Sequence, residues 1–350
     1  MRFRKILSLA LALCLLMTVL PLHTFAAAEK QTDKQAPLYA NLKDSAHYPK
    51  ITIQEVEPDT AEAPEDSDAL WEGTKTYAPT YLSVDKAALK LRDYMKARQT
   101  SFELNIKTTD YYQHEDVVDA LLKKATAHTG KATEGDYLLW HLNQWGGNVE
   151  TEWDGDITHY FRFKVELSYY TTAAQEKELT TAVNALLKTL NVKNKSDYEK
   201  VKAVYDYICN NVTYDYEHLP TPDYELMYTA YAALVHKTAV CQGYATLLYR
   251  LLLELGVDCR VITGLAITGE PHAWNIVKLG KVYYNMDATW DAELDPDQFF
   301  LRNSAMNATH YRYLDYMTTQ FHRDYPMSAT DYAEGVAGEP EYVIVSGNCD

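Results

Sequence analysis

Residues 239–256 read AVCQGYATLLYRLLLELG. After Cys241 the leucines recur at intervals of three and four, which predicts a buried helix, and Gly256 is typical of the position just past a helix end. Cys241 lies in the first turn, where unpaired backbone N–H groups and the positive end of the helix dipole stabilise a thiolate. Most free cysteines are nevertheless structural, so position alone leaves both interpretations open.

Two stretches of alternating residues follow the helix, HAWNIVK at 272–278 and KVYYNMD at 281–287. They predict two antiparallel strands joined by a two-residue turn at Leu279-Gly280. In that register His272 lies opposite Asp287, with Cβ atoms ~5 Å apart. A carboxylate that accepts a hydrogen bond from one imidazole nitrogen leaves the other to contact a thiol. Together with the cysteine, this pair indicates a catalytic triad, although a bulge would shift the register.

The region resembles the core of the transglutaminase-like superfamily. The blocks that carry the resemblance are AVCQGYA at 239–245, GV at 256–257, VITG at 261–264, HAWN at 272–275 and DATWD at 287–291. A looser likeness extends from Ala173 to Tyr332. It implies an α+β, papain-like fold in which the cysteine helix packs on an antiparallel sheet that carries the histidine and the aspartate.

The resemblance also implies the role of each residue. Cys241 would be the nucleophile, His272 the base and later the acid, and Asp287 the residue that orients the imidazole. Catalysis would pass through a thioester on the cysteine, formed from an amide and released to water or to an amine. The Cys241 backbone N–H is a natural oxyanion donor. Tyr231, ten residues upstream, is a candidate side-chain donor, and a packing role for it is equally compatible with the sequence.

The chain departs from the animal crosslinking enzymes of this superfamily. Those enzymes have Trp directly after the nucleophile, where this chain has Gln242, and no acidic cluster here resembles their calcium sites. The sequence is closer to the microbial branch, whose members are often regarded as peptidases and some as inactive. Members often have glycine just before the cysteine, whereas this chain has His236-Lys237-Thr238, which weakens any inference about substrate.

No cofactor is needed for this chemistry, and we predict no metal site. His310 and His322 lack a matching spacing of acidic residues or cysteines, and we interpret them as solvated or rim histidines. Cys209, Cys259 and Cys349 are too few for a disulfide scaffold, and the sequence leaves any pairing among them open.

Composition excludes several other classes of protein. Among 350 residues, 47% are hydrophobic and 23% are charged, which is the balance of a globular protein. The net charge of −16 argues against a nucleic-acid-binding protein and against attraction to an anionic membrane surface.

The N-terminus has the features of a secretory signal peptide. Basic residues at 2–5 precede an apolar run at 6–20, and Ala26-Ala27-Ala28 is a small-residue cleavage site. The run is shorter than the ~20 residues that span a bilayer, and no later segment is long and apolar enough to do so. Residues 1–28 are therefore predicted to be removed, and the protein to be secreted or held in the cell envelope without a membrane span.

The remaining chain divides into three predicted parts. Residues 29–79 form an acidic, proline-containing linker with one short strand at 51–56. Residues 80–170 form a small α/β domain, and residues 171–350 form the transglutaminase-like domain, with its core at about 195–295. Within the small domain we predict helices from Ser83 and around 118–125, strands around 102–106 and 161–169, and a loop at 140–153 that contains Gly146-Gly147. Ser196 and Glu199 form a capping box at the start of another helix.

These patterns favour a secreted thiol enzyme that acts on amide bonds of protein or peptide, including cell-wall peptide. Hydrolysis is favoured over transamidation, because an amine competes with water for the thioester only where the site excludes water. The alternative is a catalytically silent binding or scaffold module of the cell envelope, which would use a tyrosine-rich groove in a chain that holds 29 Tyr.

Overall fold

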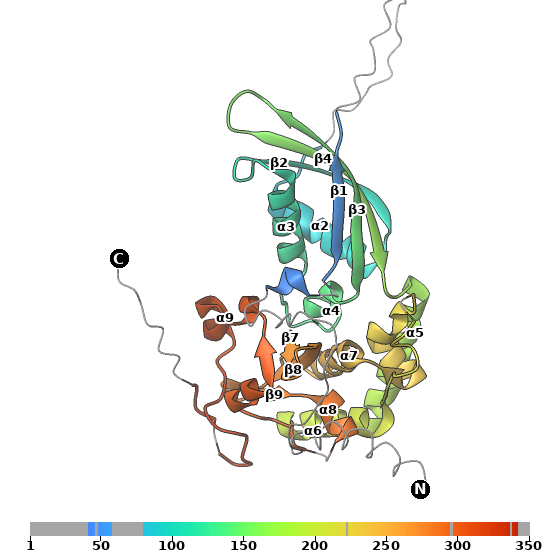
Figure 1. Ribbon diagram of the computed structural model, residues 1–350, viewed down its shortest axis with the longest axis vertical. Helices are drawn as coiled ribbons and strands as arrows, with labels where there is room; N and C mark the ends of the chain where they lie inside the picture. The colour runs from blue at the N-terminus through green and yellow to red at the C-terminus, as the bar shows by residue number, and fades with distance from the viewer. Residues whose placement is uncertain are drawn as a thin grey trace, which may run out of the picture. The chain divides into compact units, whose positions relative to one another are not determined.

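The computed structural model describes residues 41–45, 48–57, 80–221, 223–294, 297–336 and 338–341. The predicted signal peptide and most of the predicted linker lie outside these residues. The described chain contains two four-stranded sheets and a two-stranded one, with helices packed around them (Figure 1).

The first sheet has the strand order β1-β3-β4-β2. Its strands are β1 (Lys50–Glu55), β2 (Ser101–Thr108), β3 (Leu142–Trp153) and β4 (His159–Tyr169). β1 runs parallel to β3, and the other neighbours are antiparallel. The helices of this region are α2 (Val84–Lys96), α3 (His114–Ala125) and the short α4 (Asp136–Leu139). The helices predicted from Ser83 and around 118–125, and the strands predicted around 102–106 and 161–169, are confirmed as α2, α3, β2 and β4, because the spacing of their apolar residues matches the period of each element.

The predicted loop at 140–153 is wrong, since most of this stretch is strand β3. Trp145 is fully buried in it. Gly147 has a φ of +121°, and a Cβ atom there would lie 2.0 Å from the carbonyl oxygen of Lys164 in β4. The glycine therefore permits a close approach of two strands, rather than marking a turn.

The second sheet is antiparallel, with the order β10-β7-β8-β9. Its strands are β7 (Cys259–Ala266), β8 (Pro271–Leu279), β9 (Val282–Met286) and β10 (His310–Arg312). Helix α7 (Cys241–Glu254) packs on β7 and β8. The predicted α+β, papain-like arrangement, with the cysteine helix on an antiparallel sheet, is confirmed.

Further helices surround this core. They are α5 (Ala173–Leu190), α6 (Asp197–Asn211), α8 (Ala288–Glu293) and α9 (Thr319–Asp324). Both bonds of the predicted capping box join Ser196 and Glu199 at the start of α6. The short elements are η1 (Leu42–Asp44), β5 (Thr213–Tyr214), η2 (Glu225–Tyr228), η3 (Ala232–His236), β6 (Thr238–Ala239), η4 (Ser304–Ala308) and η5 (Leu314–Tyr316).

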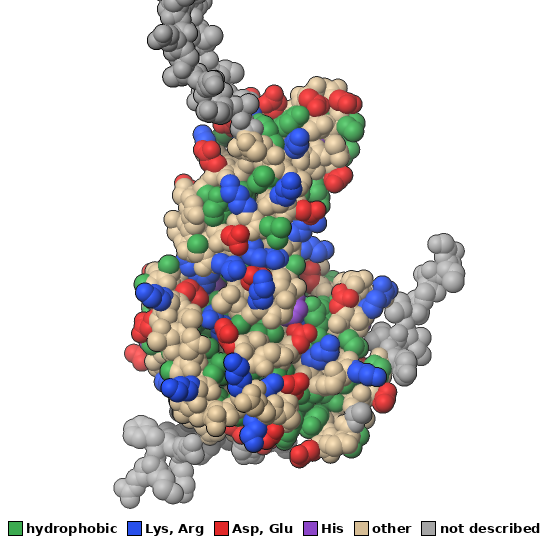
Figure 2. Space-filling view, turned by 180° about the vertical axis from the view of Figure 1, so that it is seen from behind, with side chains coloured by type: hydrophobic (Ala, Val, Ile, Leu, Met, Phe, Trp, Pro, Cys, Tyr) green, Lys and Arg blue, Asp and Glu red, His purple; other side chains and the backbone are tan. Residues whose placement is uncertain are grey.

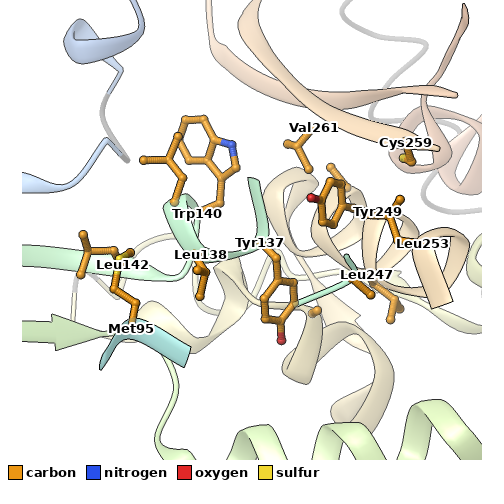
Figure 3. Packing of buried hydrophobic residues seen from close by; sticks show 14 of the residues in the cluster. Met95, Tyr137, Leu138, Trp140, Leu142, Leu247, Tyr249, Leu253, Cys259 and Val261 are labelled. Carbon is orange, nitrogen blue, oxygen red and sulfur yellow. The ribbon is translucent and has the colours of Figure 1, made fainter. Parts of the chain in front are cut away.

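One hydrophobic cluster extends from the first sheet to helix α7 (Figure 3). Met95 of α2, Leu138 of α4 and Leu247 of α7 all belong to it. Polar contacts reinforce this packing. The carboxylate of Asp136 accepts two hydrogen bonds from Arg260, at 2.7 and 2.9 Å, and a third from a backbone N–H of β7. Helix α4 is therefore bound to the second sheet by apolar and ionic contacts together.

Acidic and basic side chains are interspersed on the surface, and on the face in Figure 2 several Lys and Arg side chains gather close together. None of the helices among the described residues is long and apolar enough to cross a membrane.

Candidate active site

Cys241 is the first residue of α7, directly after the N-cap residue Val240. The start of this helix is tightly packed. A Cβ atom on Gly243 would lie 2.6 Å from the Cβ of Ala239 and 2.9 Å from the carbonyl oxygen of Met227. The buried amide of Gln242 donates to the carbonyl oxygen of Trp140 at 2.9 Å. These contacts fix the end of the helix, and so the position of the thiol.

His272 lies in β8 with 8% of its surface exposed. Its Nε2 atom is 2.8 Å from Oδ2 of Asp287, and the Cys241 side chain is near enough to contribute to the raised pKa of the ring. The structure thus brings together the three residues that the sequence predicted as a triad, with the imidazole between the thiol and the carboxylate.

The strand register that led to this prediction is wrong by two residues. Leu279 pairs with Val282, so the turn consists of Gly280 and Lys281 instead of Leu279 and Gly280. Leu279 is buried in the core, whereas Gly280 has a φ of +66°, in the region that favours glycine. A shift of two residues keeps every side chain on its predicted face, because side chains alternate with period two. His272 therefore still meets Asp287.

Asp287 directly follows the last residue of β9 and is the N-cap of α8. Its Oδ1 atom accepts hydrogen bonds from the backbone N–H groups of Thr289, at 2.9 Å, and Trp290, at 3.2 Å. The sequence DATWD therefore does two things at once: it begins a helix, and it locks the orientation of the carboxylate.

The electrostatics of the pair favour charge on both residues. Burial alone would lower the pKa of His272, but the charge and hydrogen bond of Asp287, with the bond to Cys241, raise it from 6.5 to about 10. Burial alone would raise the pKa of Asp287, but its histidine neighbours hold it well below its usual range. At neutral pH an imidazolium therefore lies near Cys241, where it can supply a proton for a leaving group.

The other described cysteines lack this environment. Cys209, Cys241 and Cys259 are all free, and Cys349 lies outside the described residues. Burial raises the pKa of both the Cys209 and the Cys259 thiol, and nearby carboxylates raise it further. Of the three described thiols, the one at the start of α7 is the candidate nucleophile.

Comparison with known proteins agrees with this geometry. Residues 184–288 match the model of the transglutaminase-like superfamily, an interval that contains all three triad residues. This segment belongs to that superfamily.

Two curated relatives are similar to part of the chain. The kyphoscoliosis peptidase of Mus musculus is 30% identical over 133 residues, which cover 35% of this chain and 20% of that protein. Its Homo sapiens counterpart is 28% identical over 132 residues, with the same coverage. The matched stretch thus spans about one fifth of the length of these relatives. A solved structure described as a TGase has a TM-score of 0.31 and 19% identity, over 56% of each chain.

A second histidine lies against the carboxylate of Asp287, which corrects the prediction that His310 is a rim residue. His310 is fully buried in β10, and its Nε2 atom is 3.0 Å from Oδ2 of Asp287. Its other ring nitrogen is 2.8 Å from the Thr309 hydroxyl. His322, in contrast, is half-buried in α9.

A glycine in β7 permits this arrangement. Gly264 lies opposite His272 in β8 and opposite Arg312 in β10. A Cβ atom at this position would lie 1.9 Å from the carbonyl oxygen of Tyr311. Only glycine lets β10 come close enough to present His310 to the carboxylate.

Tyr231, the predicted side-chain oxyanion donor, makes a different contact in the structure. Its hydroxyl donates to Glu178 at 2.8 Å, which uses the proton that an oxyanion donor would need. Two tyrosines that the sequence analysis did not single out lie nearer the thiol. Burial raises the pKa of Tyr214 and of Tyr228, and the charge of Cys241 raises both further. Among 29 tyrosines, no sequence pattern distinguishes these two.

His272, Asp287 and His310 are also ligand types that zinc accepts, and their ligand atoms all lie within 4.8 Å of one another. In this arrangement both Nε2 atoms donate protons to the carboxylate. A metal ion would have to replace these two hydrogen bonds.

Proposed function

We propose that this protein is a secreted thiol enzyme that hydrolyses amide bonds of protein or peptide substrates through a thioester on Cys241. One observation carries the proposal: His272 makes a hydrogen bond with Asp287 and has Cys241 as its other ionisable neighbour, and both neighbours raise its pKa. The two relatives that match about a third of this chain bear the name peptidase, which supports the choice of an amide substrate.

The residues suggest the order of steps. The Cys241 thiolate attacks the carbonyl carbon of the amide, and the backbone N–H of Cys241 at the start of α7 stabilises the oxyanion. The imidazolium of His272 donates its proton to the departing amine, which leaves a thioester. His272, now neutral, removes a proton from water, and the resulting hydroxide attacks the thioester carbonyl. Collapse of this intermediate releases the carboxylic acid and restores the thiolate–imidazolium pair.

Hydrolysis is preferred to transamidation because of the exposure of the site. Cys241 is only partly buried, so water reaches the thioester. Transfer to an amine requires that water be excluded. A peptide of the cell wall is the substrate class that fits a secreted or envelope enzyme, and the basic and apolar N-terminal residues support export.

The proposal can be tested with the purified wild-type protein and a Cys241→Ala variant. Each is incubated with a labelled protein and with cell-wall peptide, and mass spectrometry follows new termini and the acyl-enzyme. The wild type is expected to give cleavage and a mass adduct on Cys241, and the variant neither. A primary amine added at high concentration separates transfer from hydrolysis, because transfer would produce the amine conjugate.

The same experiment distinguishes the alternative of a silent binding module. In that case the wild type and Cys241→Ala would hold the substrate equally well, and neither would produce an adduct or a product. That outcome would contradict the enzyme proposal.

A further inference from the structure

Asp291 is a buried acidic residue that the proposed reaction does not use. It lies in α8, one turn after Asp287, and only 4% of its surface is exposed. Its carboxyl group accepts hydrogen bonds from the backbone N–H of Phe299, at 3.0 and 3.1 Å, and from the Tyr205 hydroxyl, at 2.7 Å. The charged neighbours that act on it, Asp287 and Asp297, are both acidic. The fold therefore keeps this group buried at a cost in stability, and its contacts indicate what it does.

Both hydrogen-bond partners of Asp291 also hold the backbone of Asp287. The Tyr205 hydroxyl is 2.8 Å from the carbonyl oxygen of Asp287, and the Asp287 N–H donates to the carbonyl oxygen of Phe299 at 3.0 Å. The Asp291 N–H donates to the same Asp287 carbonyl oxygen, at 3.2 Å. Asp291 is thus connected to both backbone groups of Asp287, through Tyr205 on one side and through Phe299 on the other. Such a network restrains a side chain whose own backbone it fixes.

The network joins three separate segments of the chain. Tyr205 comes from α6 and is almost fully buried, and α6 packs against α8 (Figure 1). Phe299 follows α8, and its ring centroid lies 5.0 Å from that of Trp290 and 5.5 Å from that of His310. The segment that receives the Asp287 N–H is therefore itself packed against the histidine that contacts the Asp287 carboxylate.

We propose that Asp291 is a positioning residue of the triad: it fixes the backbone of Asp287 and thereby the direction of the carboxylate that contacts His272. The inference rests on the proposed function, in which Asp287 orients the imidazole of His272. A merely structural Asp291 would tie α6 to α8 and leave the bond between Asp287 and His272 unchanged. The two roles therefore differ in the effect of Asp291 on His272.

Two substitutions of Asp291 separate hydrogen bonding from charge. In Asp291→Asn the amide oxygen accepts from Phe299, and the amide nitrogen donates to the Tyr205 oxygen, which leaves the hydroxyl proton for the Asp287 carbonyl. Asp291→Ala removes these bonds. Since both variants lack the carboxylate charge, a difference between them does not arise from charge. Tyr205→Phe keeps the ring and removes one of the two connections.

The pKa of His272 is the readout, because the charge and hydrogen bond of Asp287 help to raise it to about 10. NMR titration of protein with ¹⁵N-labelled histidine measures it, and His272→Gln assigns the signal. Asp291→Ala should lower this pKa, with an acid dissociation constant at least about tenfold higher than in Asp291→Asn. Asp291→Asn should stay within about twofold of the wild type, and Tyr205→Phe should lie between the two variants of Asp291.

Asp206 provides the matched control, since it is a partly exposed carboxylate of α6, next to Tyr205, that pairs with Lys202. Asp206→Asn and Asp206→Ala should leave the His272 pKa equal. Equal values for folded Asp291→Asn and Asp291→Ala would overturn the proposal. If Asp291→Ala does not fold, Tyr205→Phe decides, and a His272 pKa equal to that of the wild type would overturn it.

This titration needs no substrate, so it is independent of the test of the proposed function. Where the wild type cleaves a substrate, kcat should follow the same order, with Asp291→Asn above Asp291→Ala and KM little changed. A wild type without turnover would contradict the proposed function, and the titration would still decide whether Asp291 positions Asp287.

Discussion

The Nε2 atom of His310 lies 3.0 Å from Oδ2 of Asp287, the same oxygen that His272 contacts at 2.8 Å. With the two backbone N–H groups on Oδ1, this carboxylate accepts four hydrogen bonds. Since His310 is fully buried, we expect it to act by holding the carboxylate that contacts His272.

We expect His310→Ala to lower kcat about tenfold with little change in KM, because the substrate does not contact this residue. The variant also loses a hydrogen bond to a charged group, which costs about 1.5–3 kcal/mol of the free energy of unfolding. His310→Gln keeps a donor and should recover part of kcat. Steady-state kinetics and urea unfolding measure both effects. A variant that loses stability but keeps its kcat would show that His310 is merely structural.

The thiolate–imidazolium pair predicts how Cys241 reacts. Iodoacetamide should alkylate it in the wild type at about pH 5.5, and His272→Ala should slow this reaction at least tenfold. In the same variant the turnover rate should fall by about 10²–10⁴-fold, which is the contribution typical of general acid–base catalysis. Mass spectrometry locates the label, and Cys209 and Cys259 are internal controls, because burial raises the pKa of both thiols. Alkylation of Cys241 that is indifferent to His272 would contradict the pair.

The raised pKa of His272 also predicts how stability changes with pH. Burial opposes the shift, but Asp287 raises the pKa from 6.5 to about 10, so the folded protein holds this proton more tightly than the unfolded chain. The resulting stabilisation is complete below about pH 6.5 and is lost as the pH rises through about 10. The difference in unfolding free energy between the wild type and His272→Gln should therefore shrink between pH 6 and pH 10.5.

His322 is the matched control for this experiment. Burial lowers its pKa, so any effect of its protonation falls below pH 6.5 and not in the alkaline window. His322→Gln should differ from the wild type by the same amount at pH 6.5 and pH 10.5. A constant difference for His272→Gln over the same range would mean that Asp287 does not raise its pKa.

Local patterns in the sequence were sufficient to predict that His272 and Asp287 lie together. The helical spacing of apolar residues in α7, the glycine at its end and the alternation of residues in β8 and β9 depend on residues that are close in the sequence. A single sequence is therefore enough to recognise them. Even an incorrect turn left His272 on the correct face, because the error was an even number of residues.

His310 was missed because its role depends on a contact between distant segments. Its strand has three residues, too few to show a period, and 23 residues separate it from Asp287. Gly264, inside a strand, was the one local indication that another backbone comes close. Gly146-Gly147 was misinterpreted for the same reason, since glycine marks both turns and close approaches.

The contact between Asp136 and Arg260 joins α4 to the sheet that carries His272, and it predicts a large loss of stability when broken. Both side chains are largely buried, and two hydrogen bonds of 2.7 and 2.9 Å connect them. Asp136→Ala leaves a buried guanidinium without its carboxylate, which costs about 3–5 kcal/mol. Urea unfolding should show this loss, whereas Lys195→Ala, which breaks an exposed pair with Glu199, should cost less than about 0.5 kcal/mol. Similar losses for the two variants would mean that water reaches Arg260 and that this pair does not hold helix α4 to the second sheet.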